Sequence, residues 1–455
     1  MANDSAPESL EPPAVDDAAA AAAPAPAATP AGQEFRAPTG TRDVLAPESA
    51  RWTDLVATFA RSMRLAGYGL VVSPMFEDVG VFARGVGTST DVVRKEMYDF
   101  LDKGGRHVAL RPEGTASVVR AFVQHRPATP FKAWYVAPNF RYERPQAGRY
   151  RQHHQLGAEA LGSADPDIDV ELIALVAGFY RDIGLRRVAL LVNSLGDAAC
   201  RPAYSDALRA YLLARREQLC TEHQTGELEN PLRVLDCKRE QCRAATADAP
   251  LLDEYLCVEC RAHFARVTDG LDALGITWKR ERRLVRGLDY YTRTTFEFAA
   301  QALESAQNAV GGGGRYDGLA QALGGPATPG VGFGTGIERV LLALDAEGIA
   351  ASAGSGVEVF VVDTVDGTHA RALTAELRAA GLATDRAFDG RSMKSQMKAA
   401  DRSGARVAVV VGSREVELGV VAVKPLRGGD GAGQSEVARA DLVVHVAGLI
   451  ERLGN

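Results

Sequence analysis

Residues 140–155 read FRYERPQAGRYRQHHQ, a stretch that is dense in arginine and alternates between aromatic and charged side chains. Successive side chains of a β-strand point to opposite faces, so residues of one parity share a face. The even positions up to residue 160 include Phe140, Tyr142, Tyr150, Leu156, Ala158 and Ala160. The odd positions include Arg141, Glu143, Arg149, Arg151, His153, Gln155 and Glu159. With a turn at Pro145 and Gly148, the stretch predicts two antiparallel strands with one packed and one polar face.

The polar face has two interpretations. A solvated face of an antiparallel sheet normally mixes lysine, threonine, serine and glutamate, whereas residues 140–155 contain arginine and no lysine. Arginine is favoured where its planar fork grips phosphate or carboxylate through two hydrogen bonds. We therefore expect a ligand site on this face, with a simply solvated surface as the alternative.

The bulk composition limits the classes of protein. A chain of 455 residues predicts about two or three domains, and 46% hydrophobic with 24% charged residues is typical of globular proteins. The net charge of −6 argues against non-specific coating of nucleic acid but permits a local basic surface. We find no apolar run of membrane-spanning length and no pattern of a secretory signal, so we expect a cytoplasmic protein without a membrane segment.

The pattern along the chain predicts four regions. Residues 1–34 are rich in alanine and proline and are expected to be disordered, because they cannot bury enough apolar surface to offset their ordering entropy. Residues 35–350 predict a mixed domain of strands and helices. An insertion at about 197–280 is helical and carries the cysteines. After a linker, strands and helices alternate over 357–455, which indicates a separate α/β domain.

Within residues 35–350 the periodicity predicts individual elements. The expected helices cover 52–69 and 168–185, and a strand, turn and helix are expected over 108–125. The expected strands lie at 69–78, 132–143, 149–162, 188–196 and 294–300. The glycine cluster GGGGRYDG (311–318) is not assigned to an element, and 330–348 predicts a glycine-spaced strand that runs into a helix.

Six cysteines lie between positions 200 and 260: Cys200, Cys220, Cys237, Cys242, Cys257 and Cys260. Without a secretory signal, a disulfide scaffold is disfavoured. The last four form C-x4-C and C-x2-C, separated by fourteen residues, and this spacing resembles that of tetrahedral zinc sites. We expect either one zinc ion bound by Cys237, Cys242, Cys257 and Cys260, or four reduced cysteines in a helical insertion.

Several short motifs resemble those of class II aminoacyl-tRNA synthetases. FRYER (140–144) resembles motif 2, GFGTGIERV (332–340) resembles motif 3, and GLVVSPMFE (69–77) resembles motif 1. LRPEGTA (110–116) and RGLDYYTRTTFEF (286–298) are similar to the signatures of the histidyl-tRNA synthetase family. The resemblance implies an α+β fold, with an antiparallel sheet flanked by helices and a C-terminal α/β anticodon-binding domain. It also implies a homodimer formed through motif 1.

The resemblance implies that histidine is activated with ATP and then transferred to the 3′ end of its tRNA. The catalytic side chains would be Arg141, Arg286 and Arg339, and Mg²⁺ would accompany the ATP with Glu338 as a candidate contact. The ATP-binding set would comprise Arg141, Glu143, Arg149, His153, Glu338 and Arg339. His153 departs from the pattern, because the family often has a phenylalanine there to stack on adenine. The alternatives are a solvent-facing helix residue for Arg339 and a strand-end ion pair for Arg286.

The resemblance also implies a pocket for L-histidine. Its residues would be Glu113, Gly114, Thr115, Arg141, Gln155, Glu159, Arg286, Tyr290, Tyr291 and Tyr316. Glu113, Thr115 and Gln155 would accept from the ammonium group. Glu159 and Tyr291 would bind the imidazole, whose donor and acceptor an acid and a phenol can satisfy. Alternatively, Thr115 caps the helix that it starts, and one of the two adjacent tyrosines belongs to the core.

Contacts with tRNA would come from two places. Arg144, Gln146 and Arg149 lie on the motif 2 turn, and Arg391, Lys394, Lys398 and Arg402 fall at helical spacing in the last domain. A solvated helix face is the alternative for the second group. Two rival functions are a histidine-binding regulatory paralogue, which should lack the anticodon domain and the arginines, and a class II synthetase for another amino acid, which should lack LRPEGTA together with RGLDYY.

Overall fold

A computed structural model describes residues 34–87, 90–225, 230–303, 308–349, 356–427 and 433–454. The chain divides into two units, Met1–Pro38 and Thr39–Asn455, and the predicted disordered segment 1–34 lies almost wholly outside the described residues. No helix among the described residues is long and apolar enough to span a membrane.

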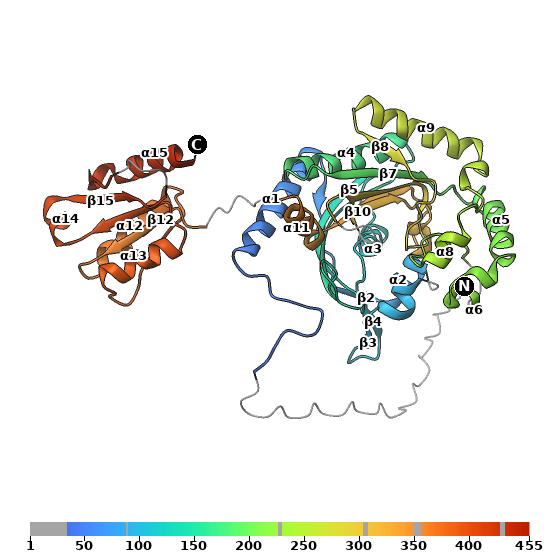
Figure 1. Ribbon diagram of the computed structural model, residues 1–455, viewed down its shortest axis with the longest axis horizontal. Coiled ribbons are helices and arrows are strands. Elements are labelled where there is room, and N and C mark those ends of the chain that lie inside the picture. Colours follow the sequence, from blue (N-terminus) through green and yellow to red (C-terminus); the bar gives the residue numbers. More distant parts are fainter. Residues whose placement is uncertain are drawn as a thin grey trace, which may run out of the picture. The chain divides into compact units, whose positions relative to one another are not determined.

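The largest element is an eight-stranded sheet with the order β1-β5-β6-β11-β10-β9-β7-β8 (Figure 1). Its strands are β1 (Gly69–Leu70), β5 (Phe131–Phe140), β6 (Gln152–Leu161), β7 (Val188–Ser194), β8 (Trp278–Arg280), β9 (Thr292–Ala300), β10 (Ala309–Arg315) and β11 (Gly330–Gly336). The two edge pairs, β1 with β5 and β7 with β8, are parallel, and the remaining pairs are antiparallel. The expected α+β architecture is confirmed.

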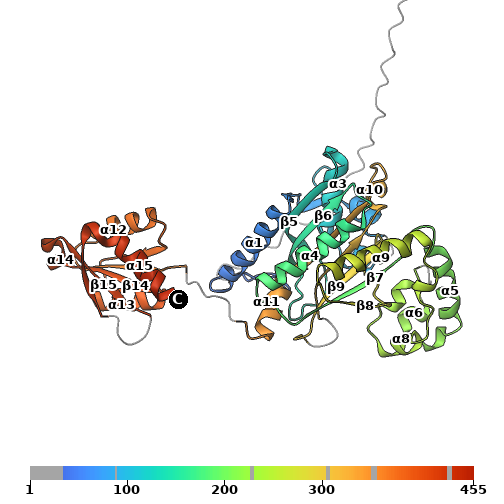
Figure 2. The same ribbon diagram turned by 90° about the horizontal axis from the view of Figure 1, so that it is seen from above.

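Four helices cover one face of the sheet, and helix α3 packs on part of the other face. The main core joins the sheet to α1 (Glu48–Leu65), α4 (Pro166–Asp182), α9 (Val258–Ala273) and α11 (Ile337–Ala346) (Figure 2). Leu156, Ala158 and Ala160 of β6 lie in this core, as their parity predicts. Helix α3 (Thr115–His125) packs on the opposite face, where Val118 contacts Ala133 and Tyr135 of β5.

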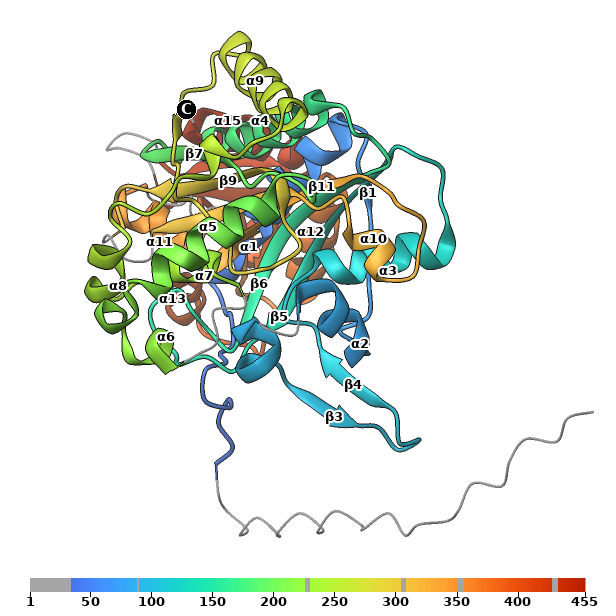
Figure 3. The same cartoon turned by 90° about the vertical axis from the view of Figure 1, so that its right-hand side faces the viewer.

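A smaller three-stranded sheet with the order β2-β4-β3 lies beside α3. It comprises β2 (Phe76–Asp78), β3 (Asp99–Leu101) and β4 (His107–Leu110), and α2 (Val79–Phe82) follows β2. Figure 3 shows β3 and β4 as a hairpin that extends from the body of this part of the molecule. The strand expected over 69–78, where it meets a proline, is divided by Pro74 into two strands of different sheets: β1 pairs with β5, whereas β2 pairs with β4.

Two other expectations differ from the structure. The strands predicted at 132–143 and 149–162 end at Phe140 and begin at Gln152, so the intervening residues form a longer loop than the turn predicted at 144–148. The unassigned glycine cluster forms most of β10, a central strand. Its glycines are needed for close approach: a Cβ on Gly312 would lie 2.7 Å from Nη1 of Arg286.

The predicted helical insertion is confirmed between β7 and β8. It contains α5 (Arg201–Leu213), α6 (Thr221–Thr225), α7 (Leu232–Leu235), α8 (Glu240–Ala245) and α9. Residues of α5, α7 and α8 share a small core of their own with all six cysteines at its centre or edge. The insertion ends in β8, which returns to the edge of the large sheet beside β7.

The last part of the chain forms the alternating α/β arrangement that its pattern predicts. Its sheet has the order β13-β12-β14-β15-β16. The strands are β12 (Val359–Asp363), β13 (Thr384–Arg386), β14 (Val407–Val411), β15 (Val420–Pro425) and β16 (Ser435–Ala438). The helices are α12 (Thr368–Ala379), α13 (Met393–Arg402), α14 (Ser413–Leu418) and α15 (Leu442–Gly454). Apolar clusters lie on both faces of this sheet.

Candidate active site

A cavity of about 210 Å³ lies on the polar face of β5 and β6, between the start of α3 and the loop before β9. Seven of the residues predicted to bind histidine line it: Glu113, Thr115, Arg141, Gln155, Arg286, Tyr290 and Tyr291. These residues are separated by up to 178 positions in the chain, from Glu113 to Tyr291. The fold therefore brings residues of LRPEGTA, FRYER and RGLDYY together with Gln155 of β6 around one cavity.

Two arginines line the cavity from different elements. Nε of Arg141, just beyond β5, donates to the carbonyl oxygen of Pro112 at 2.9 Å. Nη1 of Arg286 donates to Oε2 of Glu297 at 2.7 Å. Each guanidinium has further N–H donors beyond these bonds, so both arginines can grip an anion in the cavity while a protein acceptor holds them in place.

Glu159 lies fully buried beside the cavity at the centre of a hydroxyl network. Its Oε1 accepts from Oγ1 of Thr115 at 2.8 Å and from the Tyr135 hydroxyl at 3.3 Å. Its Oε2 accepts from the Tyr316 hydroxyl at 2.5 Å. Gly332 makes this approach feasible, because a Cβ there would lie 1.6 Å from Oε2 of Glu159. Glu159 and Tyr316 do not line the cavity; they support the residues that do.

The start of α3 is capped by Glu113 and not by Thr115. The Glu113 carboxylate accepts from the backbone N–H groups of Thr115 and Ala116 at 2.8 and 2.7 Å. Burial raises the pKa of this carboxyl group. The hydroxyl of Tyr290 also donates to it, at 3.4 Å. The side chain of Thr115 therefore does not cap α3, and its hydroxyl donates to Glu159 instead. Gly114 lies between Glu113 and Thr115.

Two residues at this site were missed from the sequence, Tyr135 and Asn139. Tyr135 lines the cavity, and Nδ2 of Asn139 donates to Oε1 of Gln155 at 2.7 Å. Both lie on β5 opposite residues of the polar face of β6, since Tyr135 pairs with Gly157 and Asn139 with His153. Applying the parity argument to 131–140 would have found them.

The loop between β5 and β6 carries the residues predicted for ATP and for the end of tRNA. Nη1 of Arg149 donates to Oε2 of Glu143 at 3.2 Å. Arg144 and Gln146 are exposed, as a contact surface requires. Burial, followed by the nearby Arg141 charge, lowers the pKa of His153 to about 3. His153 is therefore neutral near pH 7, and a neutral imidazole can stack on a base.

Helix α11, which begins within motif 3, carries Glu338 and Arg339 in different surroundings. Nε of Arg339 donates to the carbonyl oxygen of Ala309 at 2.5 Å, and its side chain lies against Gly148 of the loop. Burial lowers the pKa of Arg339, and Arg149 nearby acts in the same direction. The carboxylate of Glu338 is buried and accepts from the backbone N–H of His154 at 3.0 and 3.1 Å and lies 3.0 Å from its Nδ1.

Comparison with known proteins decides the family. Residues 40–340 match the family model "Histidyl-tRNA synthetase". The chain belongs to the histidyl-tRNA synthetase family. Residues 358–448 of this family member match a second model, "Anticodon binding domain".

Individual relatives of this synthetase-family chain agree with that assignment. It is 49% identical over 425 residues to the histidine–tRNA ligase of Rhodococcus erythropolis, covering 92% of this chain and 98% of that protein. It is 44% identical over 422 residues to that of Halothermothrix orenii, with 92% and 100% covered. The crystal structure of apo S. aureus histidyl-tRNA synthetase aligns with a TM-score of 0.75 at 35% identity, covering 91% of this chain and all of that one.

In the C-terminal part of this family member, the predicted basic stripe lies on the surface. Lys394, Lys398 and Arg402 on α13 are exposed, as is Arg391 just before it. The opposite side of α13 faces inward: Gln396 donates to the carbonyl oxygens of Asp363 and Arg391 at 2.6 and 2.7 Å. These hydrogen bonds fix the buried side of α13, so that its basic side chains are held on the exposed side.

The prediction of one four-cysteine zinc site is wrong in its grouping. Cys237 and Cys242 lie with Cys220 and His223, whereas Cys257 and Cys260 lie with Asp197 and Cys200. The reason is that Cys242 lies on α8 whereas Cys257 and Cys260 lie at the start of α9, and each pair meets residues from earlier in the chain. Spacing alone could not reveal these partners.

We expect Glu159 to make stability depend on pH. Burial raises its pKa from 4.5 to about 8, against the opposing effect of the Tyr316 and Thr115 hydroxyls. Because the folded pKa is the higher one, the contribution of Glu159 is fully present below about pH 4.5 and is lost as the pH rises through about 8. The neutral variant Glu159→Gln should therefore gain stability relative to the native chain between those pH values. Thermal unfolding midpoints across this range test it; a constant difference would contradict it.

Proposed function

We propose that the chain catalyses the attack of the L-histidine carboxylate on the α-phosphorus of ATP, forming histidyl-adenylate and diphosphate. It then transfers histidine to the 3′ end of its tRNA and releases AMP. The observation that carries this proposal is the single cavity in which Arg141 and Arg286 meet Glu113, Gln155 and the paired tyrosines. The relatives named histidine–tRNA ligase, aligned over nearly the whole chain, support it.

In the activation step, the substrate carboxylate is itself the nucleophile, so positioning and charge stabilisation carry the catalysis. We assign Arg141 to the α-phosphate and the substrate carboxylate, and Arg286 to the α-phosphate. Arg339 would contact ATP from the side of α11. The hydrogen bonds of Arg141 to Pro112 and of Arg286 to Glu297 support these roles. A guanidinium that is already held in place needs little reorganisation when negative charge develops on the phosphate oxygens in the transition state.

For histidine, we assign the ammonium group to Glu113, Thr115 and Gln155. The imidazole is assigned to Tyr291 and Glu159, with Tyr290 closing the pocket. Glu159, which is held by Tyr316, lies behind the cavity lining and would act on the imidazole through the hydroxyls of Thr115 and Tyr135. The buried acid and phenols supply both a donor and an acceptor for a neutral imidazole. An amino acid without these groups would leave buried polar atoms unpaired, which is the strongest basis for rejecting analogues.

For ATP, we assign Glu143 to the adenine amino group, Arg149 to the phosphates and His153 to the face of adenine. Mg²⁺ accompanies ATP in this proposal and neutralises the diphosphate. Glu338 is the candidate protein contact for the ion, because one N–H, that of His154, is shared between both of its carboxylate oxygens and leaves lone pairs for a cation. The ATP phosphates and water would supply the other ligands of Mg²⁺.

Aminoacylation of tRNA tests the complete proposal. The native chain with ATP, Mg²⁺ and radiolabelled histidine should charge unfractionated tRNA, and omission of ATP should abolish the signal. The rival regulatory paralogue would bind histidine without charging tRNA. The anticodon-domain match at 358–448 favours the synthetase over that rival, and we propose residues 35–350 as the catalytic domain and 357–455 as the anticodon-binding domain. A role in charging tRNA for ribosomes also supports a cytoplasmic location.

We propose that the exposed stripe on α13 binds tRNA, together with Arg144, Gln146 and Arg149 near the catalytic site. The double variant Lys394→Glu/Lys398→Glu should raise the KM for tRNA by about tenfold or more at low salt, because each reversed charge repels phosphate. Histidine-dependent ATP–pyrophosphate exchange should stay unchanged. Lys279→Glu, an exposed lysine on β8, is the matched control; equal effects of the two on KM would contradict the assignment.

We propose a homodimer formed through the motif 1 region. Large apolar side chains are exposed there in the single chain, Val72 at 86%, Phe76 at 56% and Leu70 at 54%, and adjoining exposed apolar patches mark interaction sites. The variant Val72→Asp should shift the sedimentation coefficient from dimer to monomer at micromolar concentration. Val444→Asp, at a comparably exposed valine of α15, should not, and a monomeric native chain would refute the proposal.

A further inference from the structure

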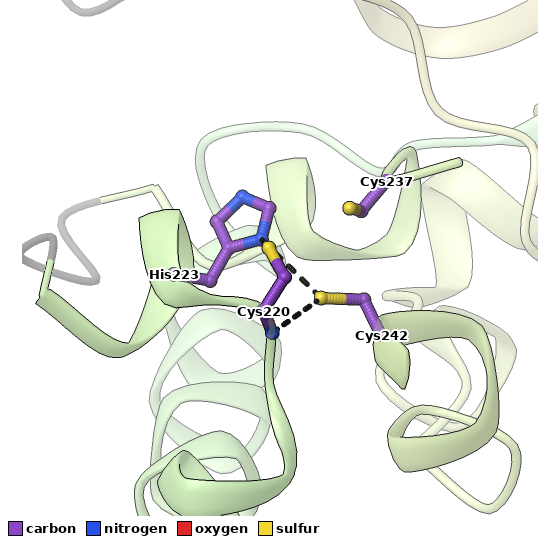
Figure 4. Close-up of side chains that lie close together, drawn as sticks. All are labelled: Cys220, His223, Cys237 and Cys242. Carbon is purple, nitrogen blue, oxygen red and sulfur yellow. Dashed lines mark hydrogen bonds between the residues drawn. The ribbon is translucent and has the colours of Figure 1, made fainter. Parts of the chain in front are cut away.

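Three cysteines and one histidine of the insertion converge on one point (Figure 4). Cys220 precedes α6, His223 lies on α6, Cys237 follows α7 and Cys242 lies on α8. Nδ1 of His223 lies 3.2 Å from Sγ of Cys220 and 3.5 Å from Sγ of Cys242. One ligand atom from each of the four residues lies within 4.8 Å of all the others.

We propose that Cys220, His223, Cys237 and Cys242 bind a zinc ion. Tetrahedral zinc with Zn–S of about 2.3 Å and Zn–N of about 2.0 Å separates two thiolates by about 3.8 Å and a thiolate from an imidazole nitrogen by about 3.5 Å. The measured sulfur–nitrogen distances match the second value to within a few tenths of an ångström. Three soft thiolates and an imidazole are a donor set that selects zinc over magnesium or calcium.

The surroundings of the cluster suit an anionic thiolate site. The backbone N–H of Cys220 donates to Sγ of Cys242 at 3.3 Å, and such bonds orient a thiolate and spread its charge. The side chain of Arg239 also contacts Cys220. A zinc ion with three thiolates and one neutral imidazole carries a net charge of −1, which Arg239 offsets.

The insertion has a structural need for such a site. Helices α6, α7 and α8 have five, four and six residues, and helices this short are not stable alone in water. The apolar core that they share is small. Small cores of this kind are commonly completed by a structural metal, whose binding free energy adds directly to folding.

The cluster also connects to the cavity. Between its ligands, Asn230 and Arg233 contact the Asp289 carboxylate, Asn230 through a hydrogen bond of 2.8 Å and Arg233 through an ion pair at 3.3 Å. Asp289 belongs to the loop that carries Arg286, Tyr290 and Tyr291. The zinc ion would thus fix the segment that positions this loop, which makes the metal structural for the insertion and indirectly important for histidine binding.

Metal analysis of the untagged, full-length chain tests the site without relying on any enzymatic activity. Purified without chelators, the chain should contain about one zinc ion at this site. Cys237→Ser should lose it, with the far-UV circular dichroism of the catalytic core retained. His223→Cys should keep it, because it preserves four ligands. Cys257→Ser is the matched control, since Cys257 belongs to the separate group with Asp197, Cys200 and Cys260.

Cobalt substitution provides a second measurement if Cys237→Ser folds poorly. The native chain should show tetrahedral d–d bands and a thiolate-to-cobalt charge-transfer band, and the latter should gain intensity in His223→Cys as three thiolates become four. Less than about 0.2 zinc per native chain, or zinc that is unchanged in Cys237→Ser, would overturn the proposal. Loss of the same zinc ion in Cys257→Ser, with retention in Cys237→Ser, would overturn it as well.

Discussion

Replacing Arg286 by alanine is expected to reduce histidine-dependent ATP–pyrophosphate exchange by about 10²–10³-fold, the usual effect of removing one preorganised donor from a developing oxyanion. The guanidinium lies above Gly312, where no side chain separates it from the sheet, and Glu297 holds it at 2.7 Å. The loss should fall mainly on kcat, because the interaction that is removed strengthens only in the transition state.

Arg282→Ala is the matched control for this experiment. Arg282 lies four positions earlier, is exposed, and pairs with Asp253 in the insertion. Its removal should leave exchange within about twofold of the native rate, since exposed ion pairs contribute little. Full exchange activity in Arg286→Ala would refute the role of Arg286 and would favour the simple ion pair with Glu297 that the sequence left open.

Replacing Glu159 by alanine is expected to raise the KM for histidine by about 100-fold or more, with a much smaller change in the KM for ATP. The carboxyl group of Glu159 accepts from the hydroxyls of Thr115, Tyr135 and Tyr316. Its removal leaves these buried donors without their common acceptor, at a cost of about 1–3 kcal/mol for each group. Steady-state exchange kinetics with varied histidine and varied ATP separate the two constants.

The same substitution also lowers stability, so a control must separate the two effects. Thr328→Val removes a buried hydroxyl whose bond is to the Pro326 carbonyl, outside the hydroxyl network. It should lower the unfolding temperature without a selective rise in the KM for histidine. If Glu159→Ala changed the KM values for histidine and ATP equally, the proposed role of Glu159 in binding the imidazole would be contradicted.

Much of the site could be predicted because strand parity and short motifs act locally. The alternation around residue 156 placed Leu156 and Ala158 in the core and Gln155 at the cavity, since a strand has only two faces. The motifs gave Glu113, Arg286 and Tyr291, which indeed meet. The same alternation did not predict that the strands stop at Phe140 and Gln152, because the loop residues bond to other parts of the chain, such as Arg151 to Gly40.

Other features could not be predicted because they depend on tertiary neighbours. A run of glycines has low intrinsic strand preference, and β10 forms because its backbone pairs with β9 on one side and β11 on the other. Arg286 and these strands leave no room for larger residues at Gly312 and Gly313. The cysteine partners could not be predicted either, because Cys220 and His223 come together with Cys237 and Cys242 only in the folded insertion. The depressed pKa of His153 arises from its burial and from Arg141, which only the folded loop supplies.

The central claim is that this cavity activates histidine in particular. ATP–pyrophosphate exchange measured with the native chain and each of the twenty standard amino acids tests it most directly. The account predicts exchange with histidine that exceeds exchange with every other amino acid by about 100-fold or more, because the buried acid and phenols remain unpaired without an imidazole. Absence of exchange with histidine, or faster exchange with another amino acid, would contradict it.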